Sequence, residues 1–298
     1  MGSVALTVGM RWTDRLIGLI STLILARLLM PSDFGIVAMC SLVIGLVDVL
    51  LDLGVGTVLI RDRSATPSHY HTAWTLRVMQ TAFGAAIVVI VAPAAAKYFG
   101  DPRLTVVLRV MALGLVLAGL ENIGVVDFQK EMRFGMEFRF TFLKRIVAFG
   151  VTMIAAVMLR SYWALVIGTL LGRTFGLVLS YVMHPLRPRI TLVRFREIFS
   201  VSQWMLVRGT GFYLDGSLHS FLVGGRDDAT VMGGYTLAND VASMPATELL
   251  APLNRVLFPA FVHASHDQGE LRRLFLLAQG VQTLVAIPAS VGPITRES

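Results

Sequence analysis

Long apolar segments alternate with short polar connections along the whole chain. Eight of these segments reach the ~20 residues that a helix needs to cross a bilayer. They lie near residues 5–29, 34–60, 72–96, 104–126, 137–159, 162–184, 197–223 and 233–262, and a ninth begins near residue 271. The pattern predicts an all-α polytopic membrane protein with about eight complete transmembrane helices and part of a ninth.

Two of the predicted turns resemble each other. Leu25–Met39 reads LARLLMPSDFGIVAM, and Phe221–Ala238 reads FLVGGRDDATVMGGYTLA. In each, an apolar helix ends, a short acidic turn follows, and a glycine lies early in the next helix. These glycines are Gly35 and, 198 positions later, Gly233. Apolar helices also resemble one another by chance, so an internal duplication and a chance likeness both remain open.

A duplication would divide the chain into two lobes. Six helices separate the two turns, and an even number gives parallel repeats related by an axis along the membrane normal. We therefore expect an N-terminal lobe at residues 1–190, with helices one to six. Residues 191–298 would begin a C-terminal lobe, with helices seven and eight and part of a ninth. The expected architecture is a two-lobed transporter whose second lobe is incomplete.

Composition agrees with a membrane protein, and the loop charges give an orientation. Only 15% of residues are charged, and the mean hydropathy is +0.71, whereas soluble domains carry about 25% charged residues. Basic residues concentrate in alternate loops, as is typical of the cytoplasmic side. These loops hold Arg61, Arg63, Lys130, Arg133, Arg139, Lys144, Arg145, Arg187, Arg189, Arg194, Arg196, Arg272 and Arg273. The N-terminus is therefore predicted to be cytoplasmic.

Several charged residues fall inside the predicted helices, where each costs ~2.5–3.5 kcal/mol at mid-bilayer. On five helices they share a face with small or hydroxyl residues at spacings of three and four. The cationic candidates are Arg11, Arg15, Arg173 and Arg208, and the acidic ones are Asp14, Asp48, Asp52, Asp215 and Asp240. We interpret these faces as the lining of a wet, partly cationic cavity for an anionic head group, because arginine binds phosphate bidentately.

Simpler interpretations remain for parts of this pattern. The small residues can serve helix–helix contacts alone, and one or two of the charges can be structural ion pairs. Arg11 and Arg15 lie near the predicted cytoplasmic end, so they can equally be topology anchors. The acidic candidates would balance the positive charge, and one of them could couple transport to a proton or a sodium ion.

Other chemistries find little support in the sequence. There is no Walker A loop, and the single cysteine, Cys40, excludes an internal disulfide. Neither a metal site nor a catalytic arrangement stands out, so we predict neither an enzyme nor a cofactor. The stretch 127–145 interleaves phenylalanine with basic residues. Between two membrane helices it is predicted to lie in the head-group layer, and nucleic acid is not an expected partner.

Five strings together resemble a known family. They are LARLLMPSDFG at Leu25–Gly35, Asp52-Leu53-Gly54, FQKEMRF at Phe128–Phe134, YWALVIG at Tyr162–Gly168 and NRVLFPAF at Asn254–Phe261. In this order they resemble bacterial polysaccharide exporters of the O-antigen and colanic-acid type, in the superfamily that includes the multidrug and toxin extrusion transporters. The resemblance covers nearly the whole chain.

The resemblance implies a two-lobed helical transporter of the bacterial inner membrane, usually with 12 or 14 helices. Such proteins flip undecaprenyl-pyrophosphate-linked oligosaccharide repeat units by alternating access, for lipopolysaccharide, capsule or exopolysaccharide biosynthesis. The implied partners are the bilayer, the lipid-linked oligosaccharide and other polysaccharide assembly proteins. Measured against that family, this chain is C-terminally truncated.

Three alternatives stand beside the flippase. A cation-coupled small-molecule exporter of the same superfamily would favour an acidic cavity. A membrane-embedded polysaccharide-processing enzyme should carry a large outer loop or a catalytic His/Asp motif. An inactive, truncated remnant would need neither an acidic cavity nor a catalytic motif.

Overall fold

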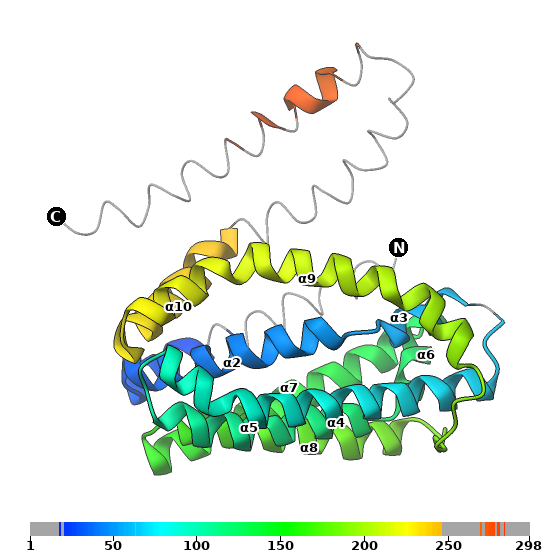
Figure 1. Cartoon of the computed structure of the whole chain (residues 1–298), viewed down its shortest axis with the longest axis horizontal. Helices are drawn as coiled ribbons and strands as arrows, with labels where there is room; N and C mark the ends of the chain where they lie inside the picture. The colour runs from blue at the N-terminus through cyan, green and yellow to red at the C-terminus, as the bar shows by residue number, and fades with distance from the viewer. Residues whose placement is uncertain are drawn as a thin grey trace. The chain divides into compact units, whose positions relative to one another are not determined.

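The structure is a computed structural model, and it describes residues 18, 21–62, 64–245, 269, 272–277, 279–280 and 283. The side chains of residues 200–205, 207–208, 241 and 243–245 lie outside the description. All regular structure in the described part is helical (Figure 1). The chain divides into two compact units, Met1–Gly234 and Tyr235–Ser298, and the contacts below all lie within the first.

Five helices in the described part are long and apolar enough to cross a membrane. They are α2 (Pro31–Leu51), α4 (Pro67–Tyr98), α5 (Arg103–Leu120), α7 (Phe134–Leu159) and α8 (Trp163–Met183). The predicted seventh and eighth segments begin as α9 (Phe195–Arg226) and α10 (Ala229–Pro245). Short helices α3 (Val55–Arg61), η1 (Ile123–Val126) and α6 (Asp127–Lys130) connect the longer ones. The all-α membrane class is confirmed, and the number of spans stays a prediction.

The predicted second helix is not continuous. It was expected over 34–60, but α2 ends at Leu51 and α3 begins at Val55. Gly54 adopts the left-handed conformation with φ +57°, and its N–H donates to Asp52 Oδ1 over 2.8 Å. A glycine takes this conformation without the steric penalty of a Cβ, so the Asp52-Leu53-Gly54 string is the physical cause of the break.

Two further boundaries differ from the expectation. The segment predicted over 104–126 ends at Leu120, and η1 and α6 follow it. The stretch 127–145 was predicted as a connection in the head-group layer, but from Phe134 onward it is the start of α7. Three basic residues counted as loop charges, Arg139, Lys144 and Arg145, therefore lie on a helix that can span the membrane.

The helices of the first unit pack mainly in pairs. In Figure 1, α2 runs between α9 on one side and α4 with α5 on the other. The pairs α4–α5 and α7–α8 are extensive, and α5 also contacts α8. The α7–α8 pair is close because Gly168, Gly172 and Gly176, spaced by four along α8, face Thr152, Ala148 and Lys144 of α7. Such small-residue stripes allow membrane helices to approach closely.

One end of the first unit gathers the loops in which basic residues were predicted to concentrate. A buried cluster there joins α3, the start of α4, η1 and the start of α9; its members include Leu59, Tyr70, Ile123 and Ile198. The connection from α8 to α9 is tied to α4, because Arg189 N donates to His71 Nδ1 over 3.3 Å and Thr191 N to Thr75 Oγ1 over 3.0 Å.

The opposite end holds the two similar turns. Buried Asp33 accepts hydrogen bonds from Met30 N over 3.0 Å and from Tyr162 N over 2.9 Å. It thereby joins the start of α2 to the turn before α8. At the start of α10, Asp228 Oδ1 accepts from Thr230 N and Val231 N, each over 2.9 Å. Both acidic turns therefore cap a helix, a structural task that leaves them no evident binding role.

The two turns also make a reciprocal contact. A Cβ on Gly35 would overlap the carbonyl oxygen of Ala229, and a Cβ on Gly233 would overlap that of Pro31. Gly233 follows Gly35 by 198 positions, and Ala229 follows Pro31 by the same number. Contacts that exchange equivalent residues are what a two-fold relation produces. The internal duplication itself stays a prediction.

Candidate functional site

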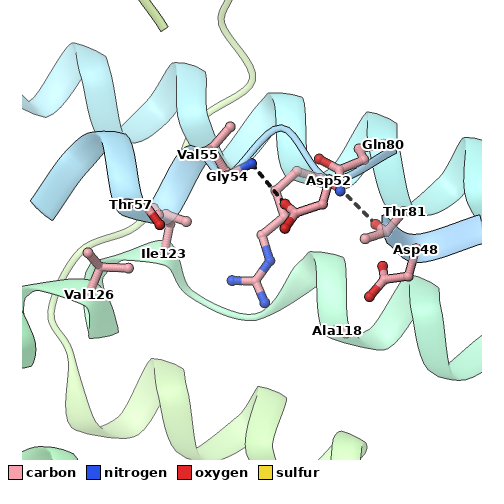
Figure 2. Close-up of a pocket in the computed structure, with 12 residues that line it drawn as sticks. Asp48, Asp52, Gly54, Val55, Thr57, Gln80, Thr81, Ala118, Ile123 and Val126 are labelled. Carbon is pink, nitrogen blue, oxygen red and sulfur yellow. Dashed lines mark hydrogen bonds between the residues drawn. The ribbon is translucent and has the colours of Figure 1, made fainter. Parts of the chain in front are cut away.

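The break between α2 and α3 opens a pocket of about 310 Å³. Figure 2 shows its lining, in which α2 and α3 face α4 and the end of α5. We call it the acidic pocket. Its residues are Asp48, Asp52, Gly54, Val55, Gly56, Thr57, Arg77, Gln80, Thr81, Ala118, Ile123 and Val126.

The acidic pocket brings together two predicted site residues. Asp48 and Asp52 lie one helical turn apart, are both exposed, and share the pocket with one cation, Arg77. The charges of Asp52, Arg173 and Arg77 all act on Asp48. Asp52 Oδ1 is engaged by the backbone at Gly54, so this carboxylate also fixes the shape of the break. Two carboxylates beside one guanidinium suit a cation or a proton better than an anion.

A second pocket, of about 380 Å³, lies between α7 and α8. We call it the basic pocket. Its residues are Phe140, Thr141, Lys144, Arg145, Ala148, Thr169, Gly172 and Arg173. Ligand pockets occupy about 300–1,000 Å³, so the volume is sufficient for a phosphate-bearing head group. Three cations and no carboxylate line it, which suits an anion.

The cations of the basic pocket are positioned by different neighbours. Arg173 Nη1 donates to Gly114 O of α5 over 2.7 Å. The ammonium of Lys144 lies 4.8 Å from the centre of the Phe140 ring, while its Cε packs where a Cβ on Gly176 would lie. Arg145 reaches back toward Gly18, 3.0 Å from the position of a Cβ there. Gly18 therefore lies close to a residue that lines the basic pocket.

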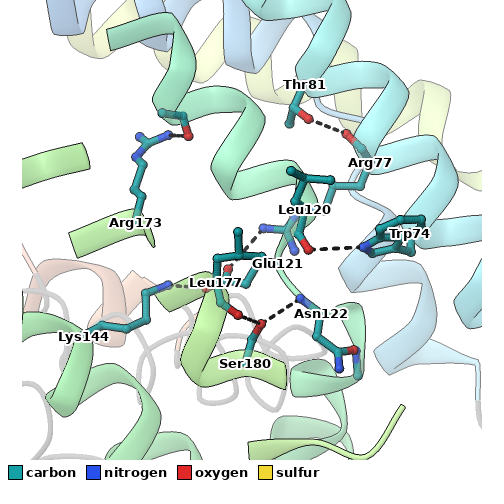
Figure 3. Close-up of polar contacts among 12 residues, drawn as sticks. Trp74, Arg77, Thr81, Leu120, Glu121, Asn122, Lys144, Arg173, Leu177 and Ser180 are labelled. Atoms are coloured by element: carbon teal, nitrogen blue, oxygen red, sulfur yellow. Dashed lines mark hydrogen bonds and ion pairs between the residues drawn. The ribbon is translucent and has the colours of Figure 1, made fainter. Parts of the chain in front are cut away.

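A buried carboxylate connects the two pockets. Glu121, at the end of α5, accepts from Lys144 Nζ over 2.6 Å and lies 3.5 Å from Arg77 Nη2 (Figure 3). Lys144 lines the basic pocket and Arg77 lines the acidic pocket. The acidic pocket and the basic pocket therefore share one counter-charge, the Glu121 carboxylate.

The backbone around Glu121 is firmly held, as Figure 3 also shows. Leu120 O accepts from Tyr181 OH over 3.1 Å and from Trp74 Nε1 over 3.5 Å. Asn122, fully buried, donates its N–H to Ser180 Oγ over 2.9 Å. These bonds satisfy polar groups that would otherwise be costly in an apolar bundle.

The remaining predicted site residues are distributed unevenly. Arg173 lines the basic pocket, and Asp48 and Asp52 line the acidic pocket; their roles stay predictions. Arg11, Asp14 and Arg15 lie outside the described residues, as does the side chain of Arg208. Asp215 on α9 and Asp240 on α10 are exposed. Within the described part, the candidates that line a pocket divide between two pockets of opposite charge, and the single cavity stays a prediction.

Sequence reasoning missed Arg77, Glu121, Lys144 and Arg145 as candidate site residues. Lys144 was assigned to a loop because basic residues near helix ends are usually topology signals. Glu121 had a usable signal, since it is an isolated carboxylate that directly follows the long apolar run 104–120. Within the described residues, no group of three or more His, Cys, Asp and Glu could hold a metal ion.

Comparison with known proteins identifies the family. The model of a family described as polysaccharide biosynthesis protein matches residues 24–296. The chain belongs to this polysaccharide biosynthesis family. This agrees with the five sequence strings, and the resemblance to polysaccharide exporters is confirmed.

The matches to curated relatives cover most of the chain. The lipopolysaccharide biosynthesis protein WzxC of Escherichia coli is 24% identical, covering 93% of this chain and 57% of its own length. The teichuronic acid biosynthesis protein TuaB of Bacillus subtilis is 22% identical over 83% of this chain and 52% of its own. The succinoglycan biosynthesis transport protein ExoT of Rhizobium meliloti is 21% identical, with 90% and 55% covered.

The chain spans about half the length of the curated relatives it matches. No solved structure matches it. With its apolar helices and these relatives, this member of the polysaccharide biosynthesis family is a multi-pass membrane protein.

Proposed function

We propose that the full protein exports polysaccharide by moving polyprenyl-pyrophosphate-linked oligosaccharide repeat units across the bacterial inner membrane. Its relatives' names support a role in polysaccharide biosynthesis, and that of ExoT supports transport. The loop charges support a cytoplasmic N-terminus. Other polysaccharide assembly proteins are the proposed protein partners.

The observation that carries this proposal is the basic pocket. Lys144, Arg145 and Arg173 meet between two helices that can span the membrane. Charged side chains at such positions are expensive, and they generally line a substrate or ion path. A pyrophosphate is an anion that suits a pocket lined by three cations, and an arginine fork binds phosphate oxygens bidentately.

No covalent step is proposed. The head group would enter the basic pocket from one side, and the two lobes would then change their relative arrangement to expose it on the other. Arg11, Arg15 and Arg208 remain candidates for contacts to the same head group, together with Arg173. Asp14, Asp215 and Asp240 remain candidates for charge balance.

The acidic pocket gives this transporter a proposed place for ion coupling. Asp48 and Asp52 form a pair of carboxylates at a helix break. Discontinuous helices near paired charges are where secondary transporters place coupling ions. A proton or a sodium ion there would bias the alternation between the two arrangements.

The same observation favours a second candidate function. A cation-coupled small-molecule exporter would use the acidic pocket for its cationic substrate or its ion. It would not need three cations between α7 and α8, so the basic pocket favours the polysaccharide substrate.

Deleting the full-length gene in its host tests the proposal. Repeat units linked to their lipid should accumulate on the inner leaflet, inaccessible in spheroplasts to an impermeant oxidant such as periodate. Normal surface polysaccharide in the deletion strain would contradict the proposal, and sensitivity to drugs alone would favour the second candidate.

A further inference from the structure

Glu121 is the one charged side chain described here that contacts cations from both pockets. Its residue is 9% exposed, and its carboxylate accepts from Lys144 at 2.6 Å and lies 3.5 Å from Arg77. The shorter distance means that in this arrangement the carboxylate mainly neutralises the lysine of the basic pocket.

Hydrogen bonds on both sides of Glu121 hold its backbone in place. Leu120 O and Asn122 N, on either side of Glu121, are bonded to α4 and α8. The carboxylate bridges the two cations, with Oε1 on Lys144 and Oε2 on Arg77, so side-chain rotation is what would draw it away from Lys144. A shift toward Arg77 would leave Lys144 free of its counter-charge without moving any helix.

The geometry points to Glu121 as a built-in counter-anion of the basic pocket, which an incoming phosphate must displace from Lys144. The inference rests on the proposed function, because it assumes that the basic pocket receives a phosphate-bearing head group. Glu121 is a positioning residue in this scheme, since it acts on the ligand only through Lys144. Arg77 receives the displaced carboxylate, so binding in one pocket changes the charge in the other.

Displacement of Glu121 predicts the direction in which phosphate affinity changes when its carboxylate is removed. A carboxylate that competes for Lys144 weakens phosphate binding, whereas one that merely held Lys144 in place would strengthen it. Removing the carboxylate should therefore tighten the binding of a phosphate ligand. A charge-assisted hydrogen bond of this kind corresponds to a change in affinity of about tenfold.

The test measures binding to purified full-length protein in detergent with three probes: farnesyl diphosphate, inorganic pyrophosphate and farnesol. Glu121→Gln should bind farnesyl diphosphate about tenfold more tightly than the wild type. Farnesol, which lacks the phosphates, should bind both proteins equally. If the pocket takes free phosphate as well as a lipid head group, inorganic pyrophosphate will follow farnesyl diphosphate; if the lipid chain is required, only farnesyl diphosphate will respond.

Two further variants control for charge and for folding. Glu131→Gln removes the same charge from an exposed carboxylate paired with Arg133 at 2.8 Å, and it should change affinity by less than about twofold. Glu121→Asp keeps the charge but shortens the reach to Lys144, so it should tighten binding by about threefold. If Glu121→Gln fails to fold, the affinity of Glu121→Asp for farnesyl diphosphate tests the inference in its place.

The outcomes separate this inference from the function on which it rests. A wild-type protein that binds farnesol as tightly as farnesyl diphosphate would overturn both. If the wild type prefers the diphosphate but Glu121→Gln and Glu121→Asp bind it equally or more weakly, the basic pocket stands and Glu121 is only a structural partner of Lys144.

Discussion

The two pockets of the first unit place charge inside an apolar bundle in different ways. The acidic pocket arises where a helix breaks, at Asp52 and Gly54, and its carboxylates lie next to the break. The basic pocket lies between two unbroken helices held together by a stripe of glycines on α8. Its cations reach the pocket on long side chains, whereas the acidic pocket depends on its backbone.

This difference indicates different tasks. A broken helix can change shape when an ion binds, because few backbone hydrogen bonds cross the break. A tightly packed helix pair resists deformation and presents its side chains in a fixed arrangement. We therefore expect the acidic pocket to sense ions and the basic pocket to hold the head group.

The largest expected effect comes from separating α7 and α8. A Cβ at Gly172 would lie 2.7 Å from Ala148 Cβ, so Gly172→Leu should destabilise the protein by about 3 kcal/mol or more. Gly150→Leu on α7 is the matched control, because nothing lies within 4 Å of a Cβ there. Thermal unfolding in detergent measures both variants. Equal melting temperatures would contradict the close helix contact.

Next in size is the loss of a cation from the basic pocket. Lys144→Gln in the full-length gene should reduce surface polysaccharide in a complemented deletion strain by about tenfold, because the head group loses a charged partner. Arg103→Gln is the control. That residue is half exposed and bonded to Asp101 over 2.7 Å at the opposite end of the unit. A comparable loss of surface polysaccharide with Arg103→Gln would mean that export depends on the total positive charge of the protein rather than on the basic pocket.

A smaller effect is expected at the helix break itself. Gly54→Ala places a Cβ in the left-handed conformation and should destabilise the protein by about 1 kcal/mol. Gly135→Ala lies within α7 in open space, where alanine should be neutral or stabilising by up to about 1 kcal/mol. Opposite shifts in the unfolding midpoint would support the strained break, and a stabilising Gly54→Ala would rule it out.

The smallest effect should come from a hydroxyl in the basic pocket. Thr169 Oγ1 already donates to Leu165 O over 2.9 Å, so its proton is not available to a ligand. Thr169→Val should therefore change the affinity for farnesyl diphosphate by less than about twofold. A larger loss would mean that the pocket recognises its ligand through hydroxyls as well as charge.

The sequence was sufficient for the apolar helices but not for their interruptions. Long apolar runs such as 72–96 became helices, because a helix satisfies its backbone hydrogen bonds within itself, as a membrane requires. The break at Gly54 was hidden because the apolar run continues through Leu53 and Val55. Only the conformational freedom of glycine, together with the Asp52 side chain, distinguishes this position from the helices on either side.

The pockets were harder to predict than the helices. Helices that are apolar on every side carry little information about which face meets which neighbour. Arg173, Asp48 and Asp52 were predicted as candidates because each is a charged residue within a long apolar segment. The partnership of Glu121 with Lys144 and Arg77 could not be predicted, since it depends on how α4, α5 and α7 are rotated against one another.

The central claim is that the basic pocket, and not the acidic one, receives the anionic head group. Its most direct test compares the affinity of purified full-length protein for farnesyl diphosphate after each pocket is neutralised in turn. Lys144→Gln and Arg173→Gln should each weaken binding by about tenfold, whereas Asp48→Asn and Asp52→Asn should leave it unchanged or tighter. Undiminished binding in the first pair, or an equal loss in the second, would contradict the claim.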